Sequence, residues 1–311
     1  MITVASVWFR PPTADDGFLP EGPRVFGNGV GWVNIQAGAD ATVGHLHTRA
    51  WDGTGHRRHE LPARPGFALP TSRPGVVLAG CDKVVGLFDL ASDEWTPLAA
   101  IPDTHPRTII NDAEIVPGRR AVVFGTKDTS FAEPIAHLYL FTVADNAVSV
   151  LESGHTCSNG KVFADSGDTL FDIDTPRKVV TRYRFDAATR TVVEDGIALE
   201  LRHRADFPDG MCDAGDGTVI VAFFNPNFAD AGQAVRYRLG TGEVLHEWHI
   251  PDSPRVTCPL LVRRPDGVKL LLTTAVEGMP ADQLARCPNA GCLFVADATG
   301  CNPPSVEVVV L

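Results

Sequence analysis

The chain has 311 residues, of which 44% are hydrophobic and 21% charged, and its mean hydropathy is +0.01. This composition predicts a globular protein with a large core and excludes a disordered chain. The formal net charge of −11 disfavours nucleic acid as a partner, because phosphate groups would be repelled. No apolar stretch is long enough to span a membrane, so we expect no membrane partner either.

The N-terminal run, residues 1–9, is apolar but lacks a basic flank and a cleavage site, so it predicts a β-strand rather than a signal peptide. The seven cysteines are odd in number and irregularly spaced, which disfavours a disulfide framework. Reduced thiols are the rule in the cytoplasm, and we expect a cytoplasmic protein.

Short β-rich runs repeat along the chain, with turn signals between them and no long helical periodicity. Six of these runs start at residues 31, 75, 121, 169, 218 and 269, so the spacings are 44, 46, 48, 49 and 51. A repeat of this length with several strands per unit is typical of a β-propeller blade. The sequence therefore predicts an all-β, six-bladed β-propeller, with residues 1–311 forming a single domain; two packed antiparallel sheets are the alternative.

A propeller must close its ring, because an open ring leaves an exposed sheet edge. Residues 2–9 and 306–311 are β-rich runs at opposite ends of the chain. We expect the N-terminal run to supply a strand to the blade built from the C-terminal residues.

The first strand of each blade lines the central channel, so we expect the loop that enters it to point at the axis. The residues just ahead of the predicted first strands are mostly polar: Glu21, Asn111, Asn159, Asp209 and Thr257, with Gly66 and Phe67 in the second blade. Two carboxylates and two amides form an oxygen donor set that suits Ca²⁺, Mg²⁺ or Mn²⁺. The alternative is that Asn-Gly and Asp-Gly are only turn dipeptides.

Ordered motifs span nearly the whole chain: Pro20-Glu21-Gly22-Pro23, Asn111-Asp112, Ser158-Asn159-Gly160, Phe207-Pro208-Asp209-Gly210-Met211 and Val256-Thr257-Cys258. As an ordered set they resemble the senescence marker protein, gluconolactonase and luciferin-regenerating enzyme family, which includes regucalcin. The resemblance implies a six-bladed propeller with one divalent metal ion held by Glu21, Asn159 and Asp209. Ca²⁺ is the preferred candidate, with Zn²⁺, Mn²⁺, Mg²⁺ or Fe²⁺ as alternatives.

The resemblance also implies that Asn111 faces the substrate or a water molecule and that the activity is lactone hydrolysis. The family often carries arginine two residues before this asparagine, whereas this chain has Ile109. The nearest arginine is Arg107, which becomes the candidate substrate-binding residue. Ile109 predicts a more apolar pocket and weaker use of highly hydroxylated lactones.

The predicted function is therefore that of a metal-dependent lactonase, a carboxylic ester hydrolase acting on a small lactone or related ester. The cation would polarise the lactone carbonyl, and Asp209 would ligate it and act as general base. The alternatives are an esterase or phosphotriesterase of the same fold, a non-enzymatic metal-binding regulator, and an interaction propeller.

Two histidine-containing segments are assigned no catalytic role. Residues 56–60, His-Arg-Arg-His-Glu, lack the order of a zinc-protease helix and predict a solvated turn between strands. His155 and Cys157 could share one face of a strand, but no third orienting residue is evident, so we expect them to line the channel.

Overall fold

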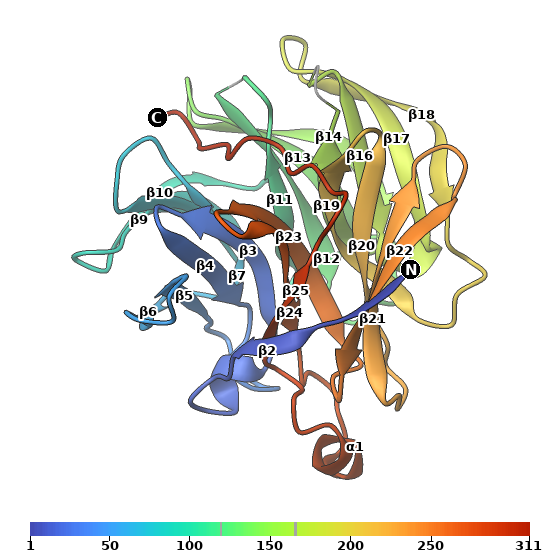
Figure 1. Cartoon of the computed structure of the whole chain (residues 1–311). Coiled ribbons are helices and arrows are strands. Elements are labelled where there is room, and N and C mark those ends of the chain that lie inside the picture. The colour runs from blue at the N-terminus through green and yellow to red at the C-terminus, as the bar shows by residue number, and fades with distance from the viewer. Residues whose placement is uncertain (119, 165–166) are drawn as a thin grey trace.

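The computed structural model describes residues 1–118, 120–164 and 167–311. Within these ranges the strands form six separate sheets arranged as a β-propeller (Figure 1). The innermost strand of each sheet contacts the innermost strand of the next sheet. The innermost strand of the sixth sheet contacts that of the first sheet, which closes the ring. The predicted all-β, six-bladed propeller is confirmed.

In each blade the strands that follow one another in the chain pair antiparallel and run outward from the axis in chain order, and the two N-terminal strands join the last two blades separately. The innermost strands are β3 (Pro20–Phe26), β7 (Pro65–Pro70), β11 (Thr108–Ile115), β15 (Ser158–Phe163), β19 (Phe207–Gly215) and β23 (Val256–Arg264). The second strands are β4 (Gly29–Asn34), β8 (Val76–Cys81), β12 (Ala121–Asp128), β16 (Thr169–Asp174), β20 (Thr218–Phe224) and β24 (Gly267–Thr274).

The third strands are β5 (His45–Ala50), β9 (Val84–Asp89), β13 (Ala136–Thr142), β17 (Val179–Asp186), β21 (Ala231–Arg238) and β25 (Leu293–Asp297). The outer strands of the first five blades are β6 (Arg57–Glu60), β10 (Glu94–Ala100), β14 (Ala147–His155), β18 (Thr191–Glu200) and β22 (Val244–Pro251). The described residues also form three short helices: η1 (Asp15–Gly17), η2 (Thr175–Arg177) and α1 (Ala281–Arg286).

The burial of the strands follows from their position between neighbouring blades. Every residue of β8 and β12 is buried, because both faces of these second strands pack against other blades. The end of β17 alternates between buried and exposed residues, as expected farther from the axis. Apolar clusters between the blades, such as Phe67, Phe124 and Tyr139, hold the sheets face to face.

The N-terminal residues close the ring, as predicted. Strand β2 (Ser6–Phe9) pairs antiparallel with β25 and becomes the outer strand of the last blade. The preceding strand β1 (Ile2–Val4) was not predicted separately, and it pairs in parallel with β22 of the neighbouring blade. In Figure 1 this N-terminal segment runs across the two C-terminal blades. Among the described residues, no helix is both long and apolar enough to cross a membrane.

An irregularity in strand pairing recurs in the innermost strand of every blade. The pairing register shifts after Glu21, Pro65, Ile110, Ser158, Pro208 and Val256. The expectation that the polar channel residues lie in loops ahead of these strands is therefore wrong. They lie within the strands, at or beside bulges, because a bulge turns a side chain away from the regular alternation while pairing continues on both sides.

Candidate functional site on the propeller axis

A cavity of about 290 Å³ lies where the bulges of four innermost strands, β3, β11, β15 and β19, meet. Its lining includes the polar residues Glu21, Asn111, Asn159 and Asp209, which come from four different blades. These side chains are buried, with relative exposures of 3%, 2%, 5% and 8%. The structure thus brings together four of the five polar residues that the repeat assigned to the axis; the fifth, Thr257, is not part of the cavity lining.

Backbone glycines let the innermost strands approach one another closely here. A Cβ atom added to Gly160 would lie 2.2 Å from the backbone nitrogen of Met211. One added to Gly210 would lie 2.6 Å from Sγ of Cys258. Both glycines directly follow a candidate ligand, so the Asn-Gly and Asp-Gly pairs permit close packing of three blades in addition to forming bulges.

The side-chain amides of Asn111 and Asn159 are oriented by hydrogen bonds to groups whose roles are unambiguous. Nδ2 of Asn111 donates to the carbonyl oxygen of Ser158 over 3.1 Å and to Oδ1 of Asn159 over 2.9 Å. Because the Ser158 carbonyl can only accept, the amide nitrogen of Asn111 must face it. Both of its hydrogens are then used, and Asn111 presents only an oxygen acceptor to the cavity.

The network continues into the next blade through Thr175 of η2. Nδ2 of Asn159 donates to Oγ1 of Thr175 over 2.8 Å, and that hydroxyl donates to the carbonyl oxygen of Pro208 over 2.9 Å. A matching contact lies across the axis, where Oγ1 of Thr257 donates to the carbonyl oxygen of Pro20 over 2.6 Å. Each candidate carboxylate, Asp209 and Glu21, thus follows a residue whose carbonyl is held by a threonine of the preceding blade.

The carboxyl groups on the axis are close enough to raise one another's pKa. Burial, followed by the charges of Asp209 and Asp112, raises the pKa of Glu21 well above its ordinary value. Burial and the charges of Asp112 and Glu277 likewise raise the pKa of Asp209 well above its ordinary value, against the opposing effect of Lys127. Concentrating these ionised groups without a bound cation is therefore unfavourable.

Three residues near the axis were assigned no separate role from the sequence. Asp112 comes within 4.8 Å of Glu21 and Cys258 when their potential ligand atoms are compared. Lys127 and Glu277 line the cavity itself, so a lysine lies in the same site as the carboxylates. Lys127 is the last residue but one of β12, and only its position beside the cavity reveals a role. Asp112 adjoins Asn111 in the sequence, which was the one available signal.

Among the described residues, those that line the cavity do not include Arg107 or Ile109. The guanidinium of Arg107 forms ion pairs with Asp128 at 3.2 Å and with Glu133 at 2.6 Å. Ile109 is 1% exposed and packs in an apolar cluster that includes Leu19 and Ile35. An apolar lining is still present, but it is supplied by other residues: Leu19, Ile35, Phe131, Phe207 and Phe224.

Cys157 and His155 do not form a nucleophilic pair. Cys157 lines the cavity, and burial raises the pKa of its thiol well above the ordinary value, which disfavours a reactive thiolate. The ring of His155 instead lies 3.1 Å from Glu152 and 3.6 Å from Asp172. The lining role expected for both residues therefore holds for Cys157 only.

The axial residues fit a hard divalent cation by their chemistry. The donors are two anionic oxygens, from the carboxylates of Glu21 and Asp209, and one neutral oxygen, from the side-chain amide of Asn159. Hard divalent cations prefer such oxygen donors. Oδ1 of Asp112 is buried and, within the described residues, lacks a hydrogen-bond partner. Positive charge bound beside these groups would offset their mutual repulsion, to which Lys127 supplies only a partial counter-charge.

The fold and this site together define a six-bladed β-propeller with an acidic, oxygen-rich cavity on its axis. A model of the SMP-30/gluconolactonase/LRE-like region matches residues 19–276, and the chain belongs to this family. Regucalcin of Danio rerio is 26% identical over 237 residues, which cover 76% of this chain and 77% of that protein.

Two solved structures have the same fold. A calcium-binding protein, regucalcin, from Agrobacterium tumefaciens superimposes with a TM-score of 0.83 at 22% identity, covering 100% of this chain and 99% of that one. A gluconolactonase from Xanthomonas campestris gives a TM-score of 0.66 at 15% identity, covering 91% of this chain and 86% of that one.

Proposed function

We propose that this protein is a metal-dependent hydrolase that opens a small lactone in the axial cavity. The observation that carries the proposal is the convergence of Glu21, Asn159 and Asp209 on one buried cavity. The family, which includes gluconolactonases, supports a lactonase-type reaction.

Glu21, Asn159 and Asp209 would hold the divalent cation, for which Ca²⁺ is the preferred candidate and Zn²⁺, Mn²⁺, Mg²⁺ and Fe²⁺ are alternatives. When bound, such an ion would polarise the lactone carbonyl and make a water molecule more acidic. Asp209 would accept the proton of the attacking water at its carboxylate, as a general base. The free oxygen of Asn111 would accept a hydrogen bond from that water or from a substrate hydroxyl and so orient it.

The cavity favours a small and weakly hydroxylated substrate. Its volume, about 290 Å³, lies at the lower end of the range usual for ligand sites. The rings of Phe131, Phe207 and Phe224 give it an apolar wall. Arg107 would have to leave two ion pairs to reach a substrate, so we assign the cationic contact to Lys127.

A calcium-binding role without turnover is the second candidate. It rests on the solved structure of a regucalcin described as a calcium-binding protein, which shares the fold over its whole length. The same axial residues would then serve a regulatory rather than a catalytic function.

A turnover screen separates these functions. The purified protein, stripped of metal and reloaded with each candidate ion, is assayed with aldonolactones, simple γ-lactones, aryl esters and phosphotriesters. The proposal predicts metal-dependent opening of lactones, with simple γ-lactones preferred over gluconolactone. Metal binding without turnover of any of these substrates would favour the calcium-binding role. A preference for phosphotriesters or aryl esters would reassign the chemistry.

A further inference from the structure

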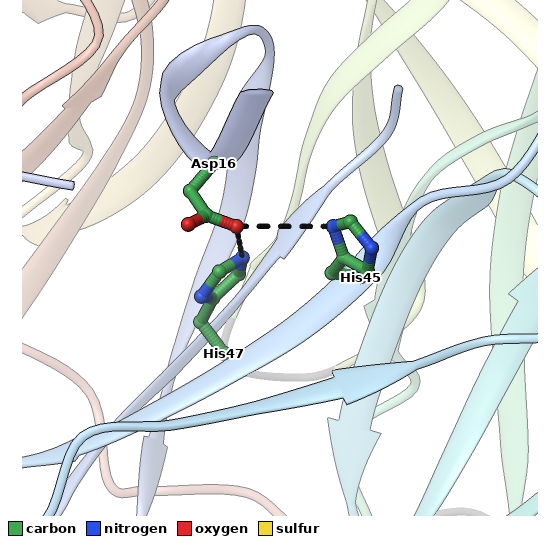
Figure 2. Close-up of side chains that lie close together, drawn as sticks. All are labelled: Asp16, His45 and His47. Carbon is green, nitrogen blue, oxygen red and sulfur yellow. Dashed lines mark ion pairs between the residues drawn. The ribbon is translucent and has the colours of Figure 1, made fainter. Parts of the chain in front are cut away.

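A second cluster of potential metal ligands lies in the first blade, outside the axial cavity. Asp16 belongs to η1, and His45 and His47 lie two residues apart on β5, where their side chains share one face of the strand. One potential ligand atom from each residue lies within 4.8 Å of the other two. Figure 2 shows both imidazole rings turned toward the same oxygen of Asp16.

The nitrogens that face Asp16 are buried without hydrogen bonds. Asp16, His45 and His47 have relative exposures of 2%, 5% and 0%. Nδ1 of His45 lies 4.0 Å and Nε2 of His47 lies 3.8 Å from Oδ1 of Asp16, distances too long for hydrogen bonds. Both nitrogens lack a hydrogen-bond partner among the described residues. A buried imidazole nitrogen without a hydrogen-bond partner costs free energy of folding. A ligand bound between the three side chains would remove that cost.

The surrounding contacts hold Asp16 in place. Thr13 donates a hydrogen bond from Oγ1 to Oδ2 of Asp16 over 2.7 Å, which leaves Oδ1 facing the histidines. Asn34 of β4 holds both ends of the η1 segment by hydrogen bonds. Its Nδ2 donates to the backbone carbonyl of Asp15 over 2.6 Å, and its Oδ1 accepts from the backbone nitrogen of Leu19 over 2.8 Å.

His47 is oriented in the manner of a ligating histidine. Its Nδ1 lies 3.1 Å from Nε2 of His56, within hydrogen-bond distance. Its ring stacks on Trp32 with the centroids 5.2 Å apart and the planes 8° from parallel. A histidine ligand usually has such a hydrogen bond at its second ring nitrogen, which fixes the tautomer and the ring direction. The expectation of a solvated turn at residues 56–60 is wrong, because this segment contains β6 and a buried His59.

We propose that Oδ1 of Asp16, Nδ1 of His45 and Nε2 of His47 form a second metal site, one that takes Zn²⁺ or a similar ion with a preference for imidazole. This inference goes beyond the proposed hydrolase function and does not depend on it. Two imidazoles and one carboxylate suit Zn²⁺, whereas the axial set consists of oxygen donors.

The geometry needs only a small contraction to accept the ion. Ligand bonds of about 2.0–2.1 Å in a tetrahedral site place the ligand atoms about 3.3–3.4 Å apart. The separations from Oδ1 of Asp16 are 3.8 and 4.0 Å, so shifts of about half an ångström bring each histidine nitrogen to the distance from this oxygen that a shared ion requires. A bound ion would tie η1 to the first blade, and η1 leads directly to Leu19 and Glu21 of the axial cavity.

Arg58 occupies the approach to this second site. Its Nη1 lies 3.4 Å from Oδ1 of Asp16, and its side chain is 46% exposed. The guanidinium supplies part of the counter-charge of Asp16 when no ion is bound. Because the side chain reaches solvent, it can swing away and open a path, and its removal should favour a bound cation.

Zinc binding tests the proposal. The metal-stripped protein is titrated with Zn²⁺ in excess Ca²⁺ by calorimetry, and X-ray absorption at the zinc edge identifies the ligands. We expect one Zn²⁺ per chain with the scattering signature of two imidazoles. Asp16→Asn and His45→Gln should each weaken binding by ~100-fold or more, since even outer-shell changes cost 10–100-fold. Arg58→Gln should tighten it several-fold.

The controls separate this site from the axis and from the surface. Glu21→Gln, which removes the charge of a proposed axial ligand, and His203→Gln, which removes an exposed histidine, should leave this zinc affinity unchanged. Wild-type protein that retains no Zn²⁺ in excess Ca²⁺, or a zinc spectrum without imidazole, would overturn the proposal. Equal zinc affinity in folded Asp16→Asn, His45→Gln and wild type would do the same. If both variants fail to fold, the wild-type spectrum alone decides.

Discussion

Nδ2 of Asn111 donates a hydrogen bond to Oδ1 of Asn159 over 2.9 Å and so joins the innermost strands of the third and fourth blades at the axis. An amide oxygen has two lone pairs, and this bond uses one of them. The other remains available to a cation. The two asparagines therefore have different roles in the proposed site, one as a ligand and the other as its support.

Thr175 should stabilise the orientation of Asn159 without contacting the metal itself. Thr175→Val keeps the shape of the side chain but removes the acceptor of Asn159 and the donor to the Pro208 carbonyl. We expect a loss of about 1–3 kcal/mol in the free energy of unfolding, because buried polar groups lose their partners. Metal affinity should fall as well, since the amide of Asn159 is no longer held. Calorimetric metal titration and urea unfolding measure both effects. Thr175→Ser should restore both stability and metal affinity. A Thr175→Val protein with wild-type metal affinity would show that the hydrogen bond from Asn159 to Thr175 does not support metal binding.

Asp209 and Glu21 can be distinguished by the response of turnover to metal concentration. Asp209→Asn keeps one oxygen donor but removes the charge and the basicity. If Asp209 is both ligand and general base, turnover at saturating metal should stay reduced by ~10²-fold or more. Glu21→Gln likewise keeps one oxygen donor and weakens ligation alone, so excess metal should restore its rate.

The measurement is the hydrolysis rate against metal concentration for both variants. Full rescue of Asp209→Asn by metal would restrict that residue to ligation. Wild-type rates in both variants after chelation would exclude the metal mechanism.

The N-terminal strands should contribute unequally to stability. Deletion of residues 1–9 removes β2 from β25 and also removes Phe9, whose ring lies 5.2 Å from that of the buried Trp32. We expect a loss of at least about 3 kcal/mol, the usual cost of deleting a buried phenylalanine, and aggregation through the uncovered strand edge. Deletion of residues 1–4 is the matched control, because Ile2 and Val4 are 59% and 65% exposed. Thermal unfolding and light scattering compare the two. Equal stability of the longer deletion and wild type would disprove ring closure by β2.

His155 should make stability depend on pH in the neutral range. Burial lowers the pKa of His155, but the hydrogen bond with Glu152 and the charges of Asp172, Asp174 and Glu152 outweigh it, so the pKa lies above its ordinary value of 6.5. The protonated imidazole of His155 is therefore stabilised more in the folded state than in the unfolded state. Its stabilisation is complete below pH ~6.5 and is lost as the pH rises through the raised pKa.

The test is urea unfolding of wild type and His155→Gln from about pH 5.5 to about pH 8.5, which brackets that interval. The advantage of wild type should be largest at the acid end and shrink toward the alkaline end. His203→Gln, at an exposed position, should follow wild type throughout. A difference between wild type and His155→Gln that stays constant with pH would show that the ion pairs of His155 do not titrate in this range.

Much of the architecture could be predicted from the order of residues, because strand propensity and turn chemistry are local properties that recur with each blade. The spacing of the β-rich second strands predicted six blades, and the closing role of residues 2–9 followed from the need to cover an edge. The positions of Glu21, Asn111, Asn159 and Asp209 relative to that repeat also predicted that they share one cavity, since equivalent positions of a closed ring face the same axis.

Tertiary structure alone decided which other side chains reach that cavity. The bulges rotate single residues toward the axis, and the sequence carries no direct sign of where pairing slips. Ile109 consequently packs in the core, Arg107 pairs with Asp128, and Lys127 lines the cavity instead. The cluster of Asp16, His45 and His47 was equally hidden, because η1 and β5 are separate segments that meet only through the packing of the first blade. Periodicity shows which residues occupy equivalent positions, whereas contacts between non-equivalent positions depend on how the strands twist and bulge in three dimensions.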